Sequence, residues 1–298
     1  MALSYSEEFV SAGVALRADV LGSVPPGGLV QDLSFLSYRL AGVERRVPST
    51  VPEPDLLWDP GRRPKGWSWQ GPTLVLAGPW EEGEIQRVLV SLLARRMEEQ
   101  GLHLFHSSCV HYLGKTVLFM TGENNSGKTM CQIEACRRGA SIVATETLVT
   151  DADGRVVSGS KGMFLRHRAR GTERTDKPSQ DEGVAKFFAR IPEFRLHEGP
   201  AKVDLVVLPD IDGHFSEFCS EMGQYEKEYQ TFHSLINYLG LHTLLSPGVP
   251  MPVLDHDDLR ARRAEFVRSF ARDRAYYLIR APRPEPILDR VEALLARM

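Results

Sequence analysis

The sequence predicts an α/β (α+β) chain: a mixed β-sheet core built around a glycine-containing loop, with a small β-rich N-terminal region and helices toward the C-terminus. Three observations predict it. Residues 1–80 hold short apolar runs separated by proline and glycine. A strand, a glycine loop, a helix and another strand follow in succession between residues 110 and 144. Beyond residue 230, apolar residues recur at helical spacing.

The N-terminal region consists of short strands and turns, on the sequence pattern. Leu74–Ala77 is an apolar run, and tryptophans occur at positions 58, 67, 69 and 80. No recognisable chemistry is found there, so residues 1–80 are predicted to form an accessory region and residues 81–298 the catalytic domain. A helix is predicted to begin after Glu81 and to end at Gly101. Its apolar face contains Ile85, Val88, Leu89, Leu92, Leu93 and Met97.

The central block predicts a βαβ unit. Val110–Tyr112 and Thr116–Thr121 form two strands, and the second runs directly into Gly122. A helix is expected over Lys128–Arg138, closed by Gly139, and Ser141–Ala144 supplies a further buried strand. Met130, Ile133 and Cys136 are expected to lie on one face of this helix.

The remaining elements complete a mixed sheet and its helices. A hairpin is expected through Asp153-Gly154. Further strands are predicted at Val156–Val157, Met163–Leu165, Val203–Leu208 and Ala275–Ile279, and helices at Thr231–Leu239, Leu259–Ala271 and Ile287–Met298.

Composition narrows the class of protein. The formal net charge of −3 is spread over mixed charges, which argues against nucleic acid as a partner. The N-terminus carries no signal-peptide pattern and no apolar stretch is long enough to span a membrane, so we expect no membrane association. Four cysteines without a C-x-x-C pair favour a reduced, cytoplasmic setting.

The loop after the second central strand satisfies G-x-x-x-x-G-K-[ST] between a strand and a helix, as a phosphate-binding loop requires. Backbone N–H groups and the positive helix end can bind phosphates there. Lys128 is expected to reach the β and γ phosphates of ATP or another nucleoside triphosphate, and Thr129 to ligate Mg²⁺. The alternative is a strand-to-helix turn that binds nothing. The predicted nucleotide-binding residues are Gly122, Glu123, Asn124, Asn125, Ser126, Gly127, Lys128 and Thr129.

Two other classes of protein carry a loop of this kind, GTPases and general ATPases. A guanine-specific GTPase is disfavoured, because Thr175–Pro178 does not supply an N-K-x-D segment. A general ATPase needs an apolar strand that ends in an acid, and Leu205–Leu208 followed by Asp210 could serve. The alternative for Asp210 is a turn residue after a strand.

The block from about Leu93 to Gly171 resembles the HPr kinase/phosphorylase-related family of P-loop kinases, whose core is of the phosphoenolpyruvate carboxykinase-like type. The resemblance is carried by Phe105–Val110, Gly114, the loop 122–129, Arg138–Ala140 and Ile142–Glu146. It implies transfer of a γ-phosphate to a hydroxyl group, with His106 near the transferring phosphate. The alternative for His106 is a residue that only lines the end of a strand.

The chain departs from this family at one pair of positions. Members carry two aspartates there, one acting as base and one helping to hold magnesium, whereas this chain has Thr145 and Glu146. Threonine cannot act as a general base near neutral pH, so Glu146 is expected to take the base role, the metal role or both. Asp151 and Asp153 are candidates to share that role.

A basic cluster follows. Its members are Arg166, Arg168, Arg170 and Arg174. Arg170 matches an active-site arginine of the family, while a solvated edge is the alternative for the cluster as a whole. The acceptor is predicted to be a small-molecule alcohol or a protein serine, and a homo-oligomer is compatible with the resemblance. A P-loop ATPase and a nucleotide-binding regulatory protein with little turnover are the competing functions.

Overall fold

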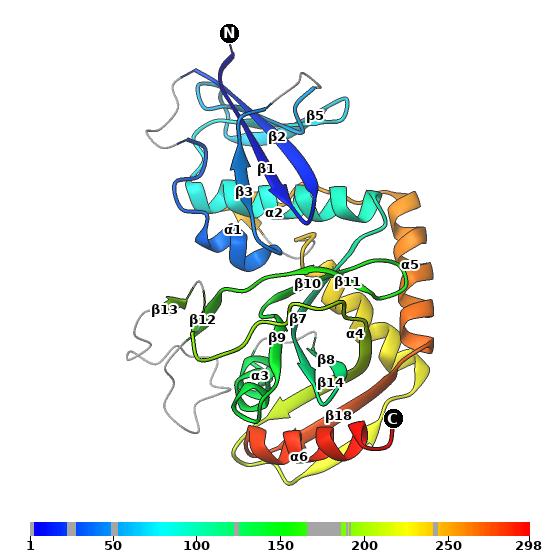
Figure 1. Cartoon of the computed structure of the whole chain (residues 1–298). Coiled ribbons are helices and arrows are strands. Elements are labelled where there is room, and N and C mark those ends of the chain that lie inside the picture. The colour runs from blue at the N-terminus through cyan, green and yellow to red at the C-terminus, as the bar shows by residue number, and fades with distance from the viewer. Residues whose placement is uncertain are drawn as a thin grey trace.

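A computed structural model of the chain describes residues 3–22, 28–48, 53–121, 125–165, 186–188, 190, 192–240 and 244–298. It is a mixed α/β structure with two large β-sheets, and six helices lie within these described residues. Figure 1 shows the first sheet at one end of the molecule and the second sheet with most of the helices at the other. None of the described helices combines the length and apolar character needed to cross a membrane.

The N-terminal region is rich in β-structure, as predicted. Its six strands lie in the order β3-β1-β2-β4-β6-β5, and β6 contains the predicted run Leu74–Ala77. The strands are β1 (Leu3–Ser11), β2 (Val14–Leu21), β3 (Glu44–Arg46), β4 (Leu56–Asp59), β5 (Gly66–Gln70) and β6 (Thr73–Ala77).

Two helices lie between this sheet and the second one (Figure 1). The short helix α1 (Ser34–Arg39), which the sequence pattern did not reveal, ends at Arg39. Helix α2 (Glu82–Glu99) is the predicted amphipathic helix, and all six predicted apolar positions are buried. Those side chains share a core with the strands of the first sheet. The predicted division at residue 80 stays a prediction.

The second sheet has eight strands, in the order β11-β10-β7-β8-β14-β18-β15, with β9 beside β7. Strands β8, β14 and β18 are parallel, whereas β7 is antiparallel to β8 and β15 is antiparallel to β18. The strands are β7 (His103–Tyr112), β8 (Lys115–Met120), β9 (Ser141–Ala144), β10 (Thr147–Thr150), β11 (Val156–Gly159), β14 (Val203–Ile211), β15 (Phe218–Glu221) and β18 (Ala275–Ala281).

The predicted succession of strand, loop, helix and strand is present, with one difference. Strands β8 and β9 are not neighbours, because β7 runs antiparallel between them. Strands β9 and β10 lie end to end along the same edge of β7, and residues 145 and 146 form the break between them. Strand β7 is also longer than predicted, since its buried centre consists of polar residues that give no apolar pattern.

Four helices cover the second sheet. Helices α3 (Lys128–Arg137) and α6 (Pro284–Leu295) pack on one face, and α4 (Gln224–Ile236) and α5 (Asp257–Arg272) pack on the other. The smaller pairs are β12 (Met163–Leu165) with β13 (Lys186–Phe188) and β16 (Leu244–Ser246) with β17 (Val249–Pro250).

The face of α3 that is buried is not the one that carries Met130, Ile133 and Cys136. Helix α3 buries Cys131, Gln132 and Ala135, while Met130 is 38% exposed. The Gln132 amide donates to the carbonyl oxygens of Cys109 and Ala144, so a polar side chain occupies the position where the pattern sought an apolar one. The hydrogen bonds to the sheet fix this face of the helix.

A buried ion network joins the α2 and α5 helices. The Arg263 guanidinium contacts Glu98 of α2 and Asp255, and the Arg263 side chain is only 2% exposed. Buried charges of this kind are costly to leave without a partner. The network therefore fixes the distance between the two helices.

We expect Arg263→Ala to lower the free energy of unfolding by about 3–5 kcal/mol, because it leaves the buried carboxylate of Glu98 without its counter-ion, while Asp255 keeps only its contact with Arg260. Urea unfolding would measure the change. Arg46→Ala is the matched control, because Arg46 pairs with Glu44 on the surface with 55% of its side chain exposed. Equal losses for the two variants would contradict this assignment.

Candidate active site

The described part of the predicted phosphate-binding loop runs from Asn125 into α3, while Gly122, Glu123 and Asn124 lie outside the described residues. Gly127 precedes the first helical residue with φ 110°, in the left-handed region. A Cβ atom at this position would lie 2.5 Å from Cδ1 of Ile211, at the end of β14. Only glycine allows the loop to lie this close to β14.

Polar contacts hold the loop against Thr121, just after β8, and against the end of β14. The Ser126 and Thr121 hydroxyls are 2.8 Å apart, and the Ser126 carbonyl oxygen accepts from the Ile211 backbone N–H at 3.0 Å. Lys128 begins α3 with its side chain buried, and its Nζ lies 3.4 Å from Thr121 Oγ. Thr129 follows in the first helical turn and is half-buried. The backbone thus presents the positive end of α3 at the loop.

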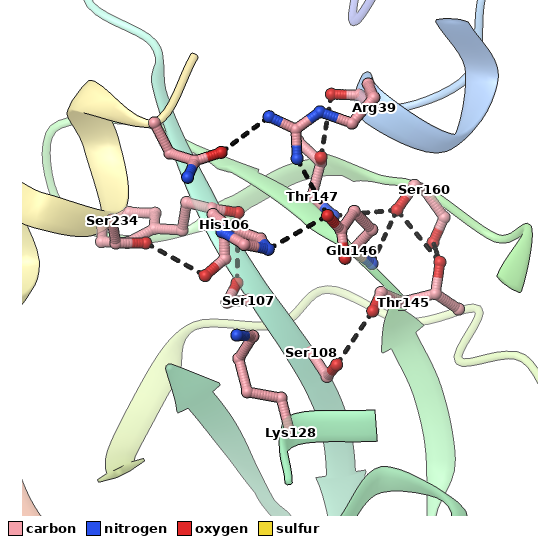
Figure 2. Close-up of polar contacts among 12 residues, drawn as sticks. Arg39, His106, Ser107, Ser108, Lys128, Thr145, Glu146, Thr147, Ser160 and Ser234 are labelled. Atoms are coloured by element: carbon pink, nitrogen blue, oxygen red, sulfur yellow. Dashed lines mark hydrogen bonds and ion pairs between the residues drawn. The ribbon is translucent and has the colours of Figure 1, made fainter. Parts of the chain in front are cut away.

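Two further predicted residues meet beside Lys128. His106 projects from β7, and Glu146 comes from the break between β9 and β10. Their atoms Nε2 and Oε1 are 3.0 Å apart, and both side chains are largely buried. Figure 2 shows this pair between Arg39 and Lys128. The structure therefore brings together His106, Lys128 and Glu146, three of the four predicted catalytic residues.

Hydrogen bonds with three serines hold the strand break that carries Glu146. Ser107 N–H donates to the Glu146 carbonyl oxygen at 2.9 Å, and the Ser108 hydroxyl donates to the carbonyl oxygen of Thr145. The Ser160 hydroxyl accepts from the backbone N–H groups of Glu146 and Thr147 (Figure 2). The backbone at Glu146 is therefore fixed on both sides.

Thr145 has a structural role. Its side chain is buried, and its hydroxyl donates to the Gly162 carbonyl oxygen at 2.5 Å and lies 3.0 Å from Ser160 Oγ. These contacts tie Thr145 to the Ser160–Gly162 segment. At the position where the family carries a second acid, this chain has a residue that holds the strand break in place.

Arg39, at the end of α1, completes the site, and sequence reasoning missed it. Residues 1–80, where the sequence shows no recognisable chemistry, therefore supply one contact to Glu146. Arg39 Nη1 donates to Glu146 Oε1 at 2.9 Å across 107 residues of sequence. It also donates to Asn237 at 2.7 Å, and its guanidinium lies over the Tyr238 ring. No local motif marks this contact, because it forms only on folding.

Opposing effects set the charge of the pair. Burial would raise the pKa of Glu146, but His106, Arg39 and Lys128 outweigh it and lower the pKa to about 2. Burial lowers the pKa of His106 and outweighs the attraction of Glu146. At neutral pH an ionised Glu146 therefore faces a neutral His106 that donates from Nε2. His106 Nδ1 is buried and has no hydrogen-bond partner in the part of the chain that the structure describes.

Lys128 is a buried cation. Burial lowers its pKa, Glu146 opposes that shift, and Arg39 adds to it. A negative group placed beside Lys128 would favour the charged ammonium form. The surroundings of Lys128 therefore suit an anionic ligand.

The other acidic residues considered from the sequence do not lie beside Glu146. Asp151 forms the turn between β10 and β11, where it accepts from the N–H groups of Asp153 and Arg155, so it does not join Glu146. The hairpin through Asp153-Gly154 is confirmed. Asp210 lies within β14 and accepts from Arg280 at 2.8 Å, so the turn reading was wrong. Beyond Val207, β14 pairs only with β18 among the described strands, which leaves room for Pro209.

The basic cluster cannot be placed. Arg166, Arg168, Arg170 and Arg174 all lie outside the described residues. Within the described ranges, no group of three His, Cys, Asp or Glu side chains could hold a metal ion by itself. Any divalent ion here would need ligands in addition to the carboxylate of Glu146.

Comparison with known proteins adds no family to these observations. No protein-family model and no curated protein matches this chain. The resemblance to HPr kinases therefore stays a prediction from the motif residues.

We expect Gly127→Ala to destabilise the protein more than Gly139→Ala. Both glycines have positive φ, but an added Cβ at Gly139 meets nothing within 4 Å. Strain alone should cost about 1–2 kcal/mol in each, and the contact with Ile211 should add about 1–3 kcal/mol at Gly127. Urea unfolding measures both, and the difference should shrink in an Ile211→Ala background. An unchanged difference there would contradict the contact.

We expect the free energy of unfolding contributed by ionised Glu146 to depend on pH. Its folded-state pKa, about 2, lies below the ordinary value of 4.5, so the contribution is complete above about pH 4.5 and is lost as the pH falls toward 2. The difference in unfolding free energy between wild type and Glu146→Gln should be on the order of 3 kcal/mol at pH 7 and vanish near pH 2. Glu44→Gln, at a side chain 71% exposed, is the control. A difference that persists at pH 2 would refute this origin.

Proposed function

We propose that the chain is a kinase that binds a nucleoside triphosphate at the loop 122–129 and transfers the γ-phosphate to a hydroxyl group. One observation carries the proposal: Lys128, at the start of the loop helix, lies beside the buried His106–Glu146 pair (Figure 2). A phosphate-binding cation and a positioned carboxylate beside it are the groups that phosphoryl transfer uses. A turn that binds nothing would not need a buried lysine at this point.

The nucleotide, ATP or another nucleoside triphosphate, would lie with its phosphates at the N-terminus of α3. Backbone N–H groups after Gly127 supply donors, and Lys128 supplies the positive charge. Gly127 allows the loop to lie against Ile211, and this contact sets where those N–H groups lie. In this proposal Arg170 contributes to the same site.

The residues present also fit a magnesium ion. Thr129 and Glu146 offer oxygen ligands, and Mg²⁺ commonly takes one or two protein oxygens together with phosphate oxygens and water. When bound, the ion would neutralise charge on the phosphates. Because Glu146 Oε1 already accepts from Arg39 and His106, its carboxylate orientation is set before any ligand arrives.

The proposed reaction needs little base chemistry. The acceptor oxygen attacks the γ-phosphorus, the bond from that phosphorus to the bridging oxygen breaks, and the nucleoside diphosphate leaves with the electron pair. The hydroxyl proton passes to Glu146. A carboxylate with a pKa of about 2 is a weak base, so its main effect is to orient the hydroxyl. Loose phosphoryl-transfer transition states depend mostly on positioning and electrostatics.

The proposed type is an HPr-kinase-like core. The motif residues support it, and so does the order β7, β8, loop, α3 and β9, followed by Thr145 and Glu146. We place the protein in the cytoplasm, with a nucleoside triphosphate and a small-molecule alcohol or protein serine as partners. The proposal includes no nucleic acid and no membrane, and leaves a homo-oligomer open.

A second candidate is a nucleotide-binding protein with little turnover. The contact between Arg39 and Glu146 favours it, because the only carboxylate at the family's acidic positions is already paired. A P-loop ATPase is a third, favoured by the backbone contact that joins Ile211, next to Asp210, to Ser126. The three functions differ in where the γ-phosphate goes.

We expect Lys128→Ala to lower phosphoryl transfer by roughly 100-fold or more, because it removes a positive charge from the transferring phosphate. Incubation with γ-labelled ATP, Mg²⁺ and a broad panel of acceptors measures the transfer. Glu146→Gln should also lower it, whereas Lys115→Ala, at the opposite end of β8, should not.

The label decides between the functions. Label on an acceptor supports the kinase, and label only in free phosphate supports an ATPase. Label that never leaves ATP, in a protein that binds ATP through Lys128, would reject the kinase in favour of the nucleotide-binding protein.

A further inference from the structure

A cavity of about 320 Å³ opens beside His106 and Glu146, on the side where the N-terminal region meets the second sheet. Its walls come from several parts of the chain that are distant in sequence. Helix α1 supplies Arg39, α2 supplies Arg87, and the segment after α4 supplies Tyr238. The volume is at the lower end of the range for small-molecule sites.

The lining combines an apolar part with positive charge. Phe35, Val90 and Met251 form apolar wall, while Arg39 and Arg87 carry the two positive charges of the lining and Glu146 the one negative charge. His106, with its buried and unpartnered Nδ1 described above, lines the same cavity. A neutral alcohol would use little of this charge. An anionic molecule would use it.

The two arginines are not equivalent. Arg39 is already engaged by Glu146 and Asn237. Arg87 is exposed, and its Nη1 donates to the Leu244 carbonyl oxygen at 3.5 Å, the limit of a hydrogen bond. A guanidinium has five N–H donors, and a carboxylate or phosphate can take two of them at once. Arg87 is therefore the group best placed to receive an added anion.

We infer that this cavity binds the phosphate acceptor, and that the acceptor is a small molecule carrying both a hydroxyl and an anionic group. The anion pairs with Arg87, and the hydroxyl lies at Glu146 and His106. The assignment of the ligand as an acceptor rests on the proposed kinase function. In the transfer, the hydroxyl oxygen bonds to the γ-phosphorus, its proton passes to Glu146, and the nucleoside diphosphate leaves with the electron pair.

The size of the cavity favours a free molecule over a protein serine. A protein acceptor would have to bring its serine and the neighbouring backbone to a space of about 320 Å³ between α1, α2 and the segment after α4. A three- or four-carbon hydroxy acid fits the same space with its charge at Arg87. The anionic group can be a carboxylate or a phosphate ester, because the Arg87 guanidinium can pair with either.

Ligand-observed NMR and γ-phosphate transfer would test the inference with matched probes. Glycerate and threonate carry a carboxylate, glycerol 3-phosphate carries a phosphate ester, and glycerol and threitol are the neutral counterparts. We expect the anionic probes to bind and accept phosphate, and the polyols to do so far more weakly. Arg87→Gln should raise the KM for the anionic probes by at least about tenfold with a smaller change in kcat.

Arg95→Gln, on the same helix but outside this cavity, is the control and should leave KM unchanged. Arg87→Lys should restore part of the binding. Equal use of acids and polyols, an unchanged KM in Arg87→Gln, or no binding by any anionic probe overturns the inference. Arg87-dependent binding without transfer would instead retain the anion site and reject the kinase.

Discussion

The carboxylate of Glu146, held between Arg39 and His106, is the contact on which the arrangement of the site depends. It joins helix α1 of the N-terminal region to the break between β9 and β10 in the second sheet. The same Arg39 reaches Asn237 and Tyr238 beyond α4, so three distant segments meet at one guanidinium. Because breaking a largely buried ion pair leaves an uncompensated charge, these segments are held together strongly.

The balance of charge around this contact explains why the site suits an anion. Arg39 and Lys128 are two cations near one carboxylate, and burial already lowers the pKa of Lys128. The phosphates of a nucleotide would supply the missing negative charge on the side of the loop. An anionic acceptor would do so on the side of Arg87. Glu146 then serves to position groups between two anions, and its low pKa keeps it charged throughout the physiological range.

The sequence predicted those parts of the fold that depend on local patterns. The apolar spacing of α2, the strand β9 and the hairpin at Gly154 all lie where the pattern places them. The sequence pattern did not predict strand β10, the full length of β7 or the buried face of α3. Buried polar residues hide such features: the Gln132 side chain of α3, for example, donates hydrogen bonds to backbone carbonyl oxygens of neighbouring strands. The resemblance to HPr kinases implied that His106 and Glu146 lie near each other, whereas nothing pointed to Arg39, since 107 residues separate it from its partner.

The central claim is that nucleotide phosphates lie between Lys128 and the His106–Glu146 pair. A crystal structure with Mg²⁺ and a non-hydrolysable ATP analogue tests this claim most directly. We expect the triphosphate at the N-terminus of α3, with Lys128 Nζ within hydrogen-bond distance of the β and γ oxygens and the γ-phosphate facing Glu146. A triphosphate bound elsewhere, or a γ-phosphate that points away from Glu146, would contradict this account.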